Sequence, residues 1–151
     1  MTFDHDFEKF PELNNAQIES LRVLSPHVQI EEDFEATVVR VHDGDTMTLK
    51  TEFRDFEFPL RLLGVDTREL NEGGEDARDF VKGLVEGVDV FVRIDRDNRV
   101  GKYGRLLGDV VVGGLSLGES LVRLGFAVPF GERNQGELPD LNKDLRLNQW
   151  Y

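Results

Sequence analysis

The sequence lacks cysteine and has no long apolar run. Without cysteine, it can form neither a disulfide framework nor a thiolate metal site. No run of apolar residues is long enough to span a bilayer, so we expect no membrane association. The first ten residues, MTFDHDFEKF, are acidic and do not combine a basic region with an apolar one, as a signal peptide does. We therefore expect a cytoplasmic protein, or a secreted one if a signal was removed.

Positive charge is also scarce. The 151 residues include 18 Lys and Arg but 30 Asp and Glu, which gives a net charge of −12. A chain of this charge is poorly suited to coating nucleic acid through bulk electrostatics, although it can still hold a local cationic pocket. Lysine occurs only at positions 9, 50, 82, 102 and 143, so arginine supplies most of the cations.

The pattern of residues changes near position 34. We interpret residues 1–33 as an N-terminal helical extension, because Asn14 and Gln17 form a capping-box pattern before a narrow apolar stripe. Residues 34–151 are interpreted as one folded domain. Strands are expected over 36–42, 46–51, 56–65, 88–94 and 105–112. Helices are expected over 75–86, from Ser116 to Gly125, and within the tail 137–151.

This order of elements predicts an α+β, mainly β, fold. Three strands, a helix, two strands and further helices suit a five-stranded OB-fold barrel with about three helices packed on it.

The stretch VHDGDTMTL, residues 41–49, places two aspartates around a glycine between two expected strands. Asp-Gly is a strong hairpin signal because both turn positions favour a positive φ. We therefore assign Asp43 and Gly44 to the turn and Asp45 to the first position of the outgoing strand. From this pattern alone, Asp45 is either an ordinary surface carboxylate or a residue placed for function.

Other polar residues follow or interrupt the hydrophobic strands. Arg61 lies on the polar face of one expected strand, Asp66 and Glu69 follow it, and GKYGR ends at Arg105. Each alone is explained by a surface ion pair, a turn or a helix cap. Together with Asp45 they provide what phosphodiester cleavage requires. Two carboxylates suit Ca²⁺ or Mg²⁺, a third can handle the attacking water, and two guanidiniums can bind phosphate oxygens.

Three motifs in this order resemble the staphylococcal nuclease-like (thermonuclease) family: VHDGDT at 41–46, RLLGVDTRE at 61–69 and GKYGR at 101–105. The helix from Glu75 and ESLVRLGFA at 119–127 match as well. The resemblance implies an OB-fold enzyme that uses Ca²⁺ rather than Mg²⁺ to hydrolyse phosphodiester bonds in DNA or RNA. It also implies a preference for single strands and 3′-phosphate products.

The resemblance assigns roles by position. Arg61 and Arg105 would bind the scissile phosphate and stabilise the transition state, and Glu69 would act as general base or orient the water. The remaining positions are the metal ligands Asp45 and Asp66 (through their carboxylates) and Thr67 (through its carbonyl), Asp43 as indirect support for the ion, and Lys102 and Tyr103 as contacts to the terminal phosphate.

The chain also departs from the family pattern. Arg68 replaces a usual proline, Gly101 replaces a usual aspartate, and the loop after Glu69 is short and acidic. The tyrosines that stack on a base in relatives are missing, and only Phe130 is placed to stack there. The base preference is therefore left open.

The main alternative is a catalytically inactive OB-fold module that binds nucleic acid or protein. The presence of the three carboxylates and both arginines favours catalysis. A stacking platform would also require several exposed aromatic residues, whereas most of the 11 Phe alternate as core residues. We expect nucleic acid as the partner and a monomer as the working unit.

Overall fold

The computed structural model describes residues 11–15, 17–18, 28–67, 74–101 and 104–129. Its named elements are β1 (Phe34–Asp43), β2 (Thr46–Lys50), β3 (Phe58–Leu62), β4 (Val65–Thr67), α2 (Glu75–Val85), β5 (Asp89–Arg93), β6 (Leu106–Val112), β7 (Leu115–Ser116), α3 (Leu117–Arg123) and β8 (Ala127–Pro129). Within these ranges no helix combines the length and the apolar character that crossing a bilayer requires.

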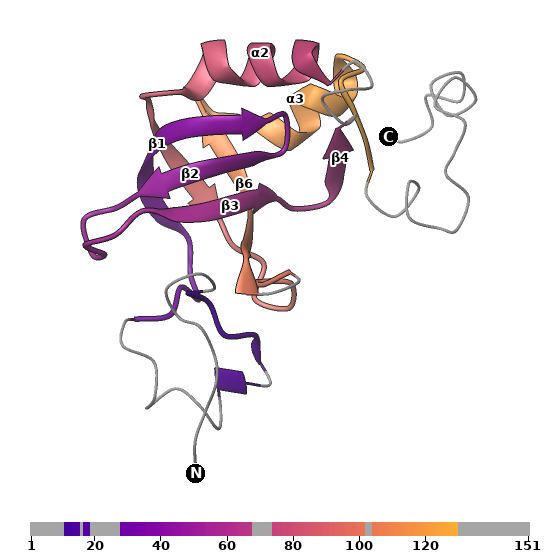
Figure 1. Cartoon of the computed structure of the whole chain (residues 1–151). Coiled ribbons are helices and arrows are strands. Elements are labelled where there is room, and N and C mark those ends of the chain that lie inside the picture. Colours follow the sequence, from indigo (N-terminus) through magenta and orange to yellow (C-terminus); the bar gives the residue numbers. More distant parts are fainter. Residues whose placement is uncertain (1–10, 16, 19–27, 68–73, 102–103, 130–151) are drawn as a thin grey trace.

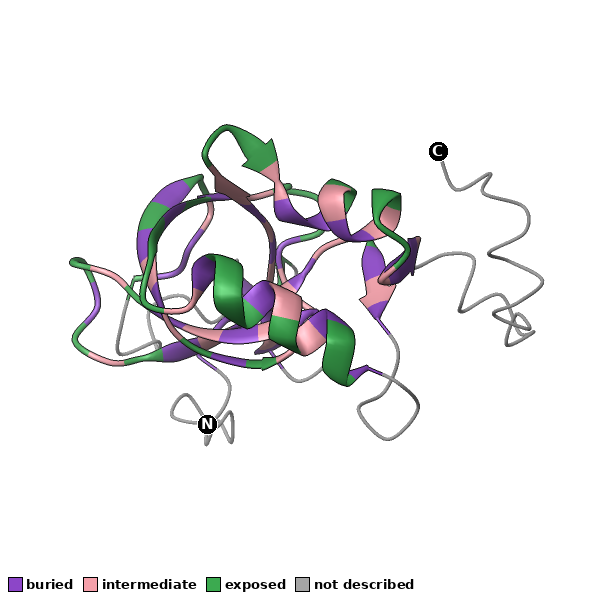
Figure 2. Cartoon of the chain, turned by 90° about the horizontal axis from the view of Figure 1, so that it is seen from above, coloured by how far each residue is buried: buried purple, intermediate pink, exposed green. Residues whose placement is uncertain are grey.

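Five of these strands close into a barrel. β1 pairs antiparallel with β2 and β5, β2 with β3, and β5 with β6. The parallel pairing of β3 with β6 closes the ring, which is seen from above in Figure 2. The expected fold, a mainly β five-stranded OB-type barrel with helices packed on it, is confirmed. α2 and α3 correspond to two of the three expected helices, and the helix expected within 137–151 lies outside the described residues.

Alternation along the strands builds the core. In β3, Phe58, Leu60 and Leu62 are buried inside the barrel, while Pro59 and Arg61 point the other way. A helix covers this core, because α2 buries Ala77, Val81 and Val85 on the face that it turns to β1. The regular two-residue period therefore forces Arg61 onto the outer surface of the barrel, at its rim.

The expected strand over 56–65 is wrong in extent, because the chain breaks it into two. β3 ends at Leu62, and Gly64 turns the chain with a φ of +80°, which a glycine adopts without strain. The next three residues form β4, which pairs with β8 from the far end of the domain, Val65 opposite Pro129. This small second sheet, missed from the sequence, carries Asp66 and Thr67 at the edge of the barrel.

The turn between β1 and β2 also differs from the expectation. Asp43 is the last residue of β1 and pairs with Thr46, so the turn residues are Gly44 and Asp45. The φ of Gly44 is not in the left-handed region, so positive φ is not the reason for glycine here. A Cβ at this position would lie 2.8 Å from the Cβ of Ala77 and 2.8 Å from the Cγ2 of Thr67. Glycine lets the turn pack directly on α2 and β4.

The expected capping box near the N-terminus is confirmed. The Asn14 side chain accepts from the backbone N–H of Gln17 at 2.9 Å, and the Gln17 side chain accepts from the N–H of Asn14 at 2.9 Å. The division of the chain at residue 33 stays a prediction.

We expect Gly44→Ala to destabilise the fold by about 1–3 kcal/mol, because the added methyl overpacks the contact with Ala77 and Thr67. Gly83→Ala is the matched control. No atom lies within 4 Å of a Cβ at Gly83 in α2, so alanine there should stabilise by about 0.5–1 kcal/mol. Urea denaturation of both variants measures the two effects. Equal stability of Gly44→Ala and the parent would contradict the close packing of the turn.

Candidate active site

The carboxylate of Asp45 is fixed by hydrogen bonds between the β1–β2 turn and β4. Its Oδ2 accepts from the backbone N–H of Thr67 at 3.0 Å and from the Thr67 hydroxyl at 3.1 Å. Its Oδ1 accepts from the hydroxyl of Thr46 at 3.2 Å. The residue is only 7% exposed, so these bonds compensate a carboxylate that has lost most of its water.

Arg61 joins this carboxylate to a second one. Its Nη2 lies 2.7 Å from Oδ1 of Asp66 and 3.5 Å from Oδ2 of Asp45. The Nη1 donates to the carbonyl of Leu62 at 3.2 Å. The three charged side chains are between 10% and 17% exposed, so the attraction is screened less than at an open surface. Arg61 on β3 thus pairs with one carboxylate from the turn, Asp45, and with one from β4, Asp66.

The two aspartates of the turn region have opposite pKa shifts. Burial raises the pKa of Asp43 from 3.8 to about 6, and the neighbouring Asp45 carboxylate adds to the effect. Burial also acts on Asp45, but hydrogen bonds from Asp43 and Thr67 and the charge of Arg61 outweigh it and lower the pKa of its carboxyl. Asp45 therefore loses its proton at a lower pH than Asp43, whose carboxyl is protonated mainly below about pH 6.

Arg105 brings a second guanidinium to the same place, from the residue that precedes β6. Its pKa is lowered, first by burial and then by the positive charge of Arg61, while Asp45 and Asp43 partly offset this. Its buried Nε has no hydrogen-bond partner among the described residues. Two guanidiniums that repel each other favour an anion between them.

The structure therefore brings together six of the predicted site residues: Asp43, Asp45, Arg61, Asp66, Thr67 and Arg105. The other three, Glu69, Lys102 and Tyr103, lie outside the described residues. Sequence reasoning missed the hydroxyl groups of Thr46 and Thr67 as donors to Asp45. Thr46 follows Asp45 directly, but nothing in the sequence connects Asp45 with Thr67, because their contact depends on the tertiary fold.

Two of the described residues carry donors that could contribute to a metal site. Asp45 and Asp66 offer carboxylate oxygens, which are the donors that Ca²⁺ and Mg²⁺ prefer. In the described part of the chain, no group of three His, Cys, Asp or Glu residues is arranged to hold a metal ion. The donor chemistry fits a hard cation, and further ligands would have to come from carbonyl groups, from water, or from the predicted Glu69.

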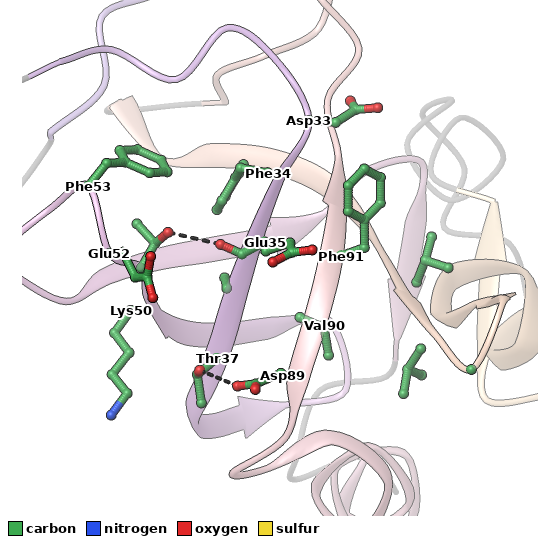
Figure 3. Close-up of a pocket in the computed structure, with 15 residues that line it drawn as sticks. Asp33, Phe34, Glu35, Thr37, Lys50, Glu52, Phe53, Asp89, Val90 and Phe91 are labelled. Atoms are coloured by element: carbon green, nitrogen blue, oxygen red, sulfur yellow. Dashed lines mark hydrogen bonds between the residues drawn. The ribbon is translucent and has the colours of Figure 1, made fainter.

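A cavity of about 930 Å³ lies away from this site. It opens on the outer face of the barrel, where Phe53 and Phe91 stand on either side of Glu35 (Figure 3). It is lined by the first half of β1 and the end of β2, whereas the predicted site lies at the opposite end of the β1–β2 hairpin. None of its described lining residues is a predicted site residue, so we do not assign the chemistry to it.

Comparisons with known proteins identify the family of this chain and several relatives. A family model described as staphylococcal nuclease homologue matches residues 59–146. Endonuclease YncB of Bacillus subtilis (strain 168) is 37% identical over 98 residues, 60% of this chain and 46% of that protein. The SPbeta prophage-derived endonuclease YokF of the same organism is 35% identical over 100 residues, 62% of this chain and 33% of that protein. The chain thus spans less than half of either relative.

The raised pKa of Asp43 predicts the pH dependence of stability. A carboxyl group whose pKa is raised by folding stabilises the folded state at pH values below its unfolded pKa, which is 3.8 here. This stabilisation is lost as the pH rises through the folded-state pKa of about 6. In the parent, the backbone N–H of Asp45 donates to Oδ1 of Asp43 at 3.0 Å. An asparagine at position 43 keeps an oxygen that can accept this bond, but its side chain cannot ionise. In chelator, Asp43→Asn should have a higher urea midpoint than the parent at pH 8. The advantage should shrink at pH 5, and an advantage independent of pH would contradict the shift.

Proposed function

The chain belongs to the family of staphylococcal nuclease homologues, and we propose that it is a Ca²⁺-dependent nuclease that hydrolyses phosphodiester bonds in DNA or RNA. The names of the relatives YncB and YokF, both endonucleases, support this proposal. The observation that carries it is the position of Arg61 between Asp45 and Asp66, with Arg105 beside it. This arrangement places cationic donors for a phosphate next to carboxylates for a cation.

Arg61 and Arg105 bind the scissile phosphate in this proposal. Negative charge builds on the non-bridging oxygens during the reaction, and donors already fixed in a partly buried site stabilise it most. Arg61 is held in place by Asp66 at 2.7 Å, so its orientation is set before substrate arrives. The Arg105 guanidinium would add a second set of cationic donors beside Arg61.

Asp45, Asp66 and the carbonyl of Thr67 would hold the Ca²⁺ ion. The hydrogen bonds from Thr67 fix the Asp45 carboxylate, so this ligand is already oriented. When bound, the ion would neutralise charge on a phosphate oxygen and favour ionisation of a nearby water. Because Asp66 pairs with Arg61, its carboxylate would serve both the guanidinium and the cation.

The remaining roles concern residues outside the described part of the chain. Glu69 follows β4 by two positions and would accept a proton from the attacking water or orient it. Lys102 and Tyr103 would contact the terminal phosphate of the strand. We also propose that the chain prefers single-stranded substrates and releases products with 3′-phosphates.

The proposed function is tested by digestion of single-stranded DNA and of RNA with Ca²⁺, with Mg²⁺ and with chelator. We expect cleavage in Ca²⁺, 3′-phosphate ends, and loss of cleavage in chelator. Asp45→Asn should lose most activity while keeping the far-UV circular dichroism of the parent, since it removes a charged ligand. Absence of cleavage under every condition, with folded protein that still binds nucleic acid, would instead support the inactive binding module.

Arg61→Lys tests the role of the guanidinium fork. Lysine keeps the positive charge but cannot bind two oxygens at fixed angles. We expect kcat to fall by about 10²–10³-fold, the usual effect of losing one donor to a transition-state anion.

Arg93→Lys is the matched control for this substitution. Arg93 pairs with Asp109 at 2.6 Å on β5, is 53% exposed, and takes no part in the proposed chemistry. Its variant should cleave like the parent. If Arg61→Lys also cleaved at the parental rate, forked phosphate binding by Arg61 would be wrong.

A further inference from the structure

An N-terminal strap, residues 11–15, packs against the end of the barrel opposite α2 (Figure 1). It contacts the loop between β5 and β6, which runs from residue 94 to residue 105 and ends at Arg105. Three sets of contacts hold the strap, one to Arg54 in the β2–β3 connection and two to this loop, and none of them belongs to the site described above.

The strap is anchored by a buried ion pair. Glu12 Oε2 lies 2.6 Å from Nη1 of Arg54, and Glu12 Oε1 accepts from Nη2 at 2.9 Å. Both side chains are fully buried, and the Arg54 guanidinium lies 4.7 Å from the ring centre of Phe58 and 5.1 Å from that of Phe56. A buried pair of this kind is costly to desolvate and is strongly disfavoured once either partner is removed, so it fixes a single position of the strap.

Arg99 holds the strap from the side of the β5–β6 loop. It is 3% exposed, and its Nη1 donates to the carbonyl of Leu13 at 3.0 Å and to Oδ1 of Asn15 at 3.0 Å. Its Nε donates to the carbonyl of Ile30 at 2.8 Å. The guanidinium therefore uses its charge to satisfy buried carbonyls of the N-terminal segment, which ties that segment to the loop.

The strap reaches the residue next to Arg105. The backbone N–H of Glu12 donates to the carbonyl of Gly104 at 3.3 Å. Two further backbone hydrogen bonds close the base of the loop. The N–H of Gly101 donates to the carbonyl of Arg105 at 2.8 Å, and the N–H of Leu107 donates to the carbonyl of Arg99 at 2.8 Å. The backbone of Arg105 is thus constrained by the strap through Gly104 and by the base of the loop.

We propose that Glu12 is a positioning residue for Arg105: its bond to Arg54 seats the strap, and the seated strap holds the end of the loop so that the Arg105 guanidinium stands beside Arg61. The expected effect on cleavage rests on the proposed function, whereas the positioning of Arg105 does not. Arg99 acts in the same way from the loop.

The test compares Glu12→Gln with Glu32→Gln. Glu32 is the matched control because it also joins the N-terminal segment to the loop, by a 2.9 Å bond to Arg96, but both side chains are at least 70% exposed. Such exposed pairs contribute little. The first readout is the Nε–H resonance of Arg105 in ¹⁵N-arginine-labelled protein, assigned by its loss in Arg105→Ala. Glu12→Gln should shift or broaden it, and Glu32→Gln should leave it unchanged.

The second readout is kcat on single-stranded DNA in a double-mutant cycle. Glu12→Gln should lower kcat by about 10–100-fold, the scale of a small misplacement, without a matching rise in KM. In the Arg105→Ala background the same substitution should change kcat by less than about twofold, because the group it positions is gone. A merely structural role for Glu12 would lower activity equally in both backgrounds.

The two readouts separate the possible failures. An unchanged Arg105 resonance in Glu12→Gln, or equal losses of kcat in both backgrounds, would overturn the positioning role. If the parent chain cleaves nothing, the proposed function fails, and the resonance still decides the positioning. Should Glu12→Gln fail to fold, Arg99→Lys takes its place in both measurements, since lysine cannot reach the carbonyls of Leu13 and Ile30 together.

Discussion

The arrangement of the site depends on the carboxylate of Asp45, which is buried between the β1–β2 turn and β4. Thr67 donates two hydrogen bonds to one of its oxygens, and Arg61 lies 3.5 Å from the same oxygen. The turn can come this close only because Gly44 has no side chain to collide with Ala77 and Thr67. Removing the whole carboxylate would leave the Thr67 donors and Arg61 without their common acceptor, so the turn, β3 and β4 would lose the contact that aligns them.

The site concentrates charges of both signs in a chain whose net charge is −12. Its cations are arginines, and the planar guanidinium of Arg61 contacts Asp45, Asp66 and a backbone carbonyl at once. A lysine has no such geometry. The cost of gathering these charges is visible in the raised pKa of Asp43 and the lowered pKa of Arg105, both caused first by burial. A bound phosphate would reduce the repulsion between Arg61 and Arg105, and a bound cation would reduce that between Asp43 and Asp45.

Features set by local sequence were predictable. The two-residue period of β2 and β3, the helix α2, and the capping of α3 by the Ser116 side chain follow from neighbouring residues, and the structure confirms them. Long-range contacts were not predictable. β4 and β8 are three-residue strands more than fifty positions apart, too short to show a period, yet they position Asp66 and Thr67. The turn was assigned one residue too early, because the packing of Gly44 on α2 has no local signal.

The ion pair of Glu12 with Arg54 was missed for a related reason. In a chain with 30 acidic residues, a glutamate is read as a solvated side chain, and only the fold shows that this one is fully buried. The site itself was recognisable in part because its residues fall in three short motifs. Their distances and mutual pKa effects depend on how the barrel closes, which no single motif encodes.

Binding of Ca²⁺ at Asp45 is tested most directly by a calorimetric titration of Ca²⁺ into the parent chain and into Asp45→Asn, each with and without a single-stranded oligonucleotide of non-hydrolysable linkages. We expect one Ca²⁺ to bind per parent chain, more tightly with the oligonucleotide than without it, because the ion and the phosphate share the site of Asp45, Asp66 and Arg61. Asp45→Asn should lose this binding. The same Ca²⁺ affinity in both proteins, or no coupling to the oligonucleotide, would contradict this expectation.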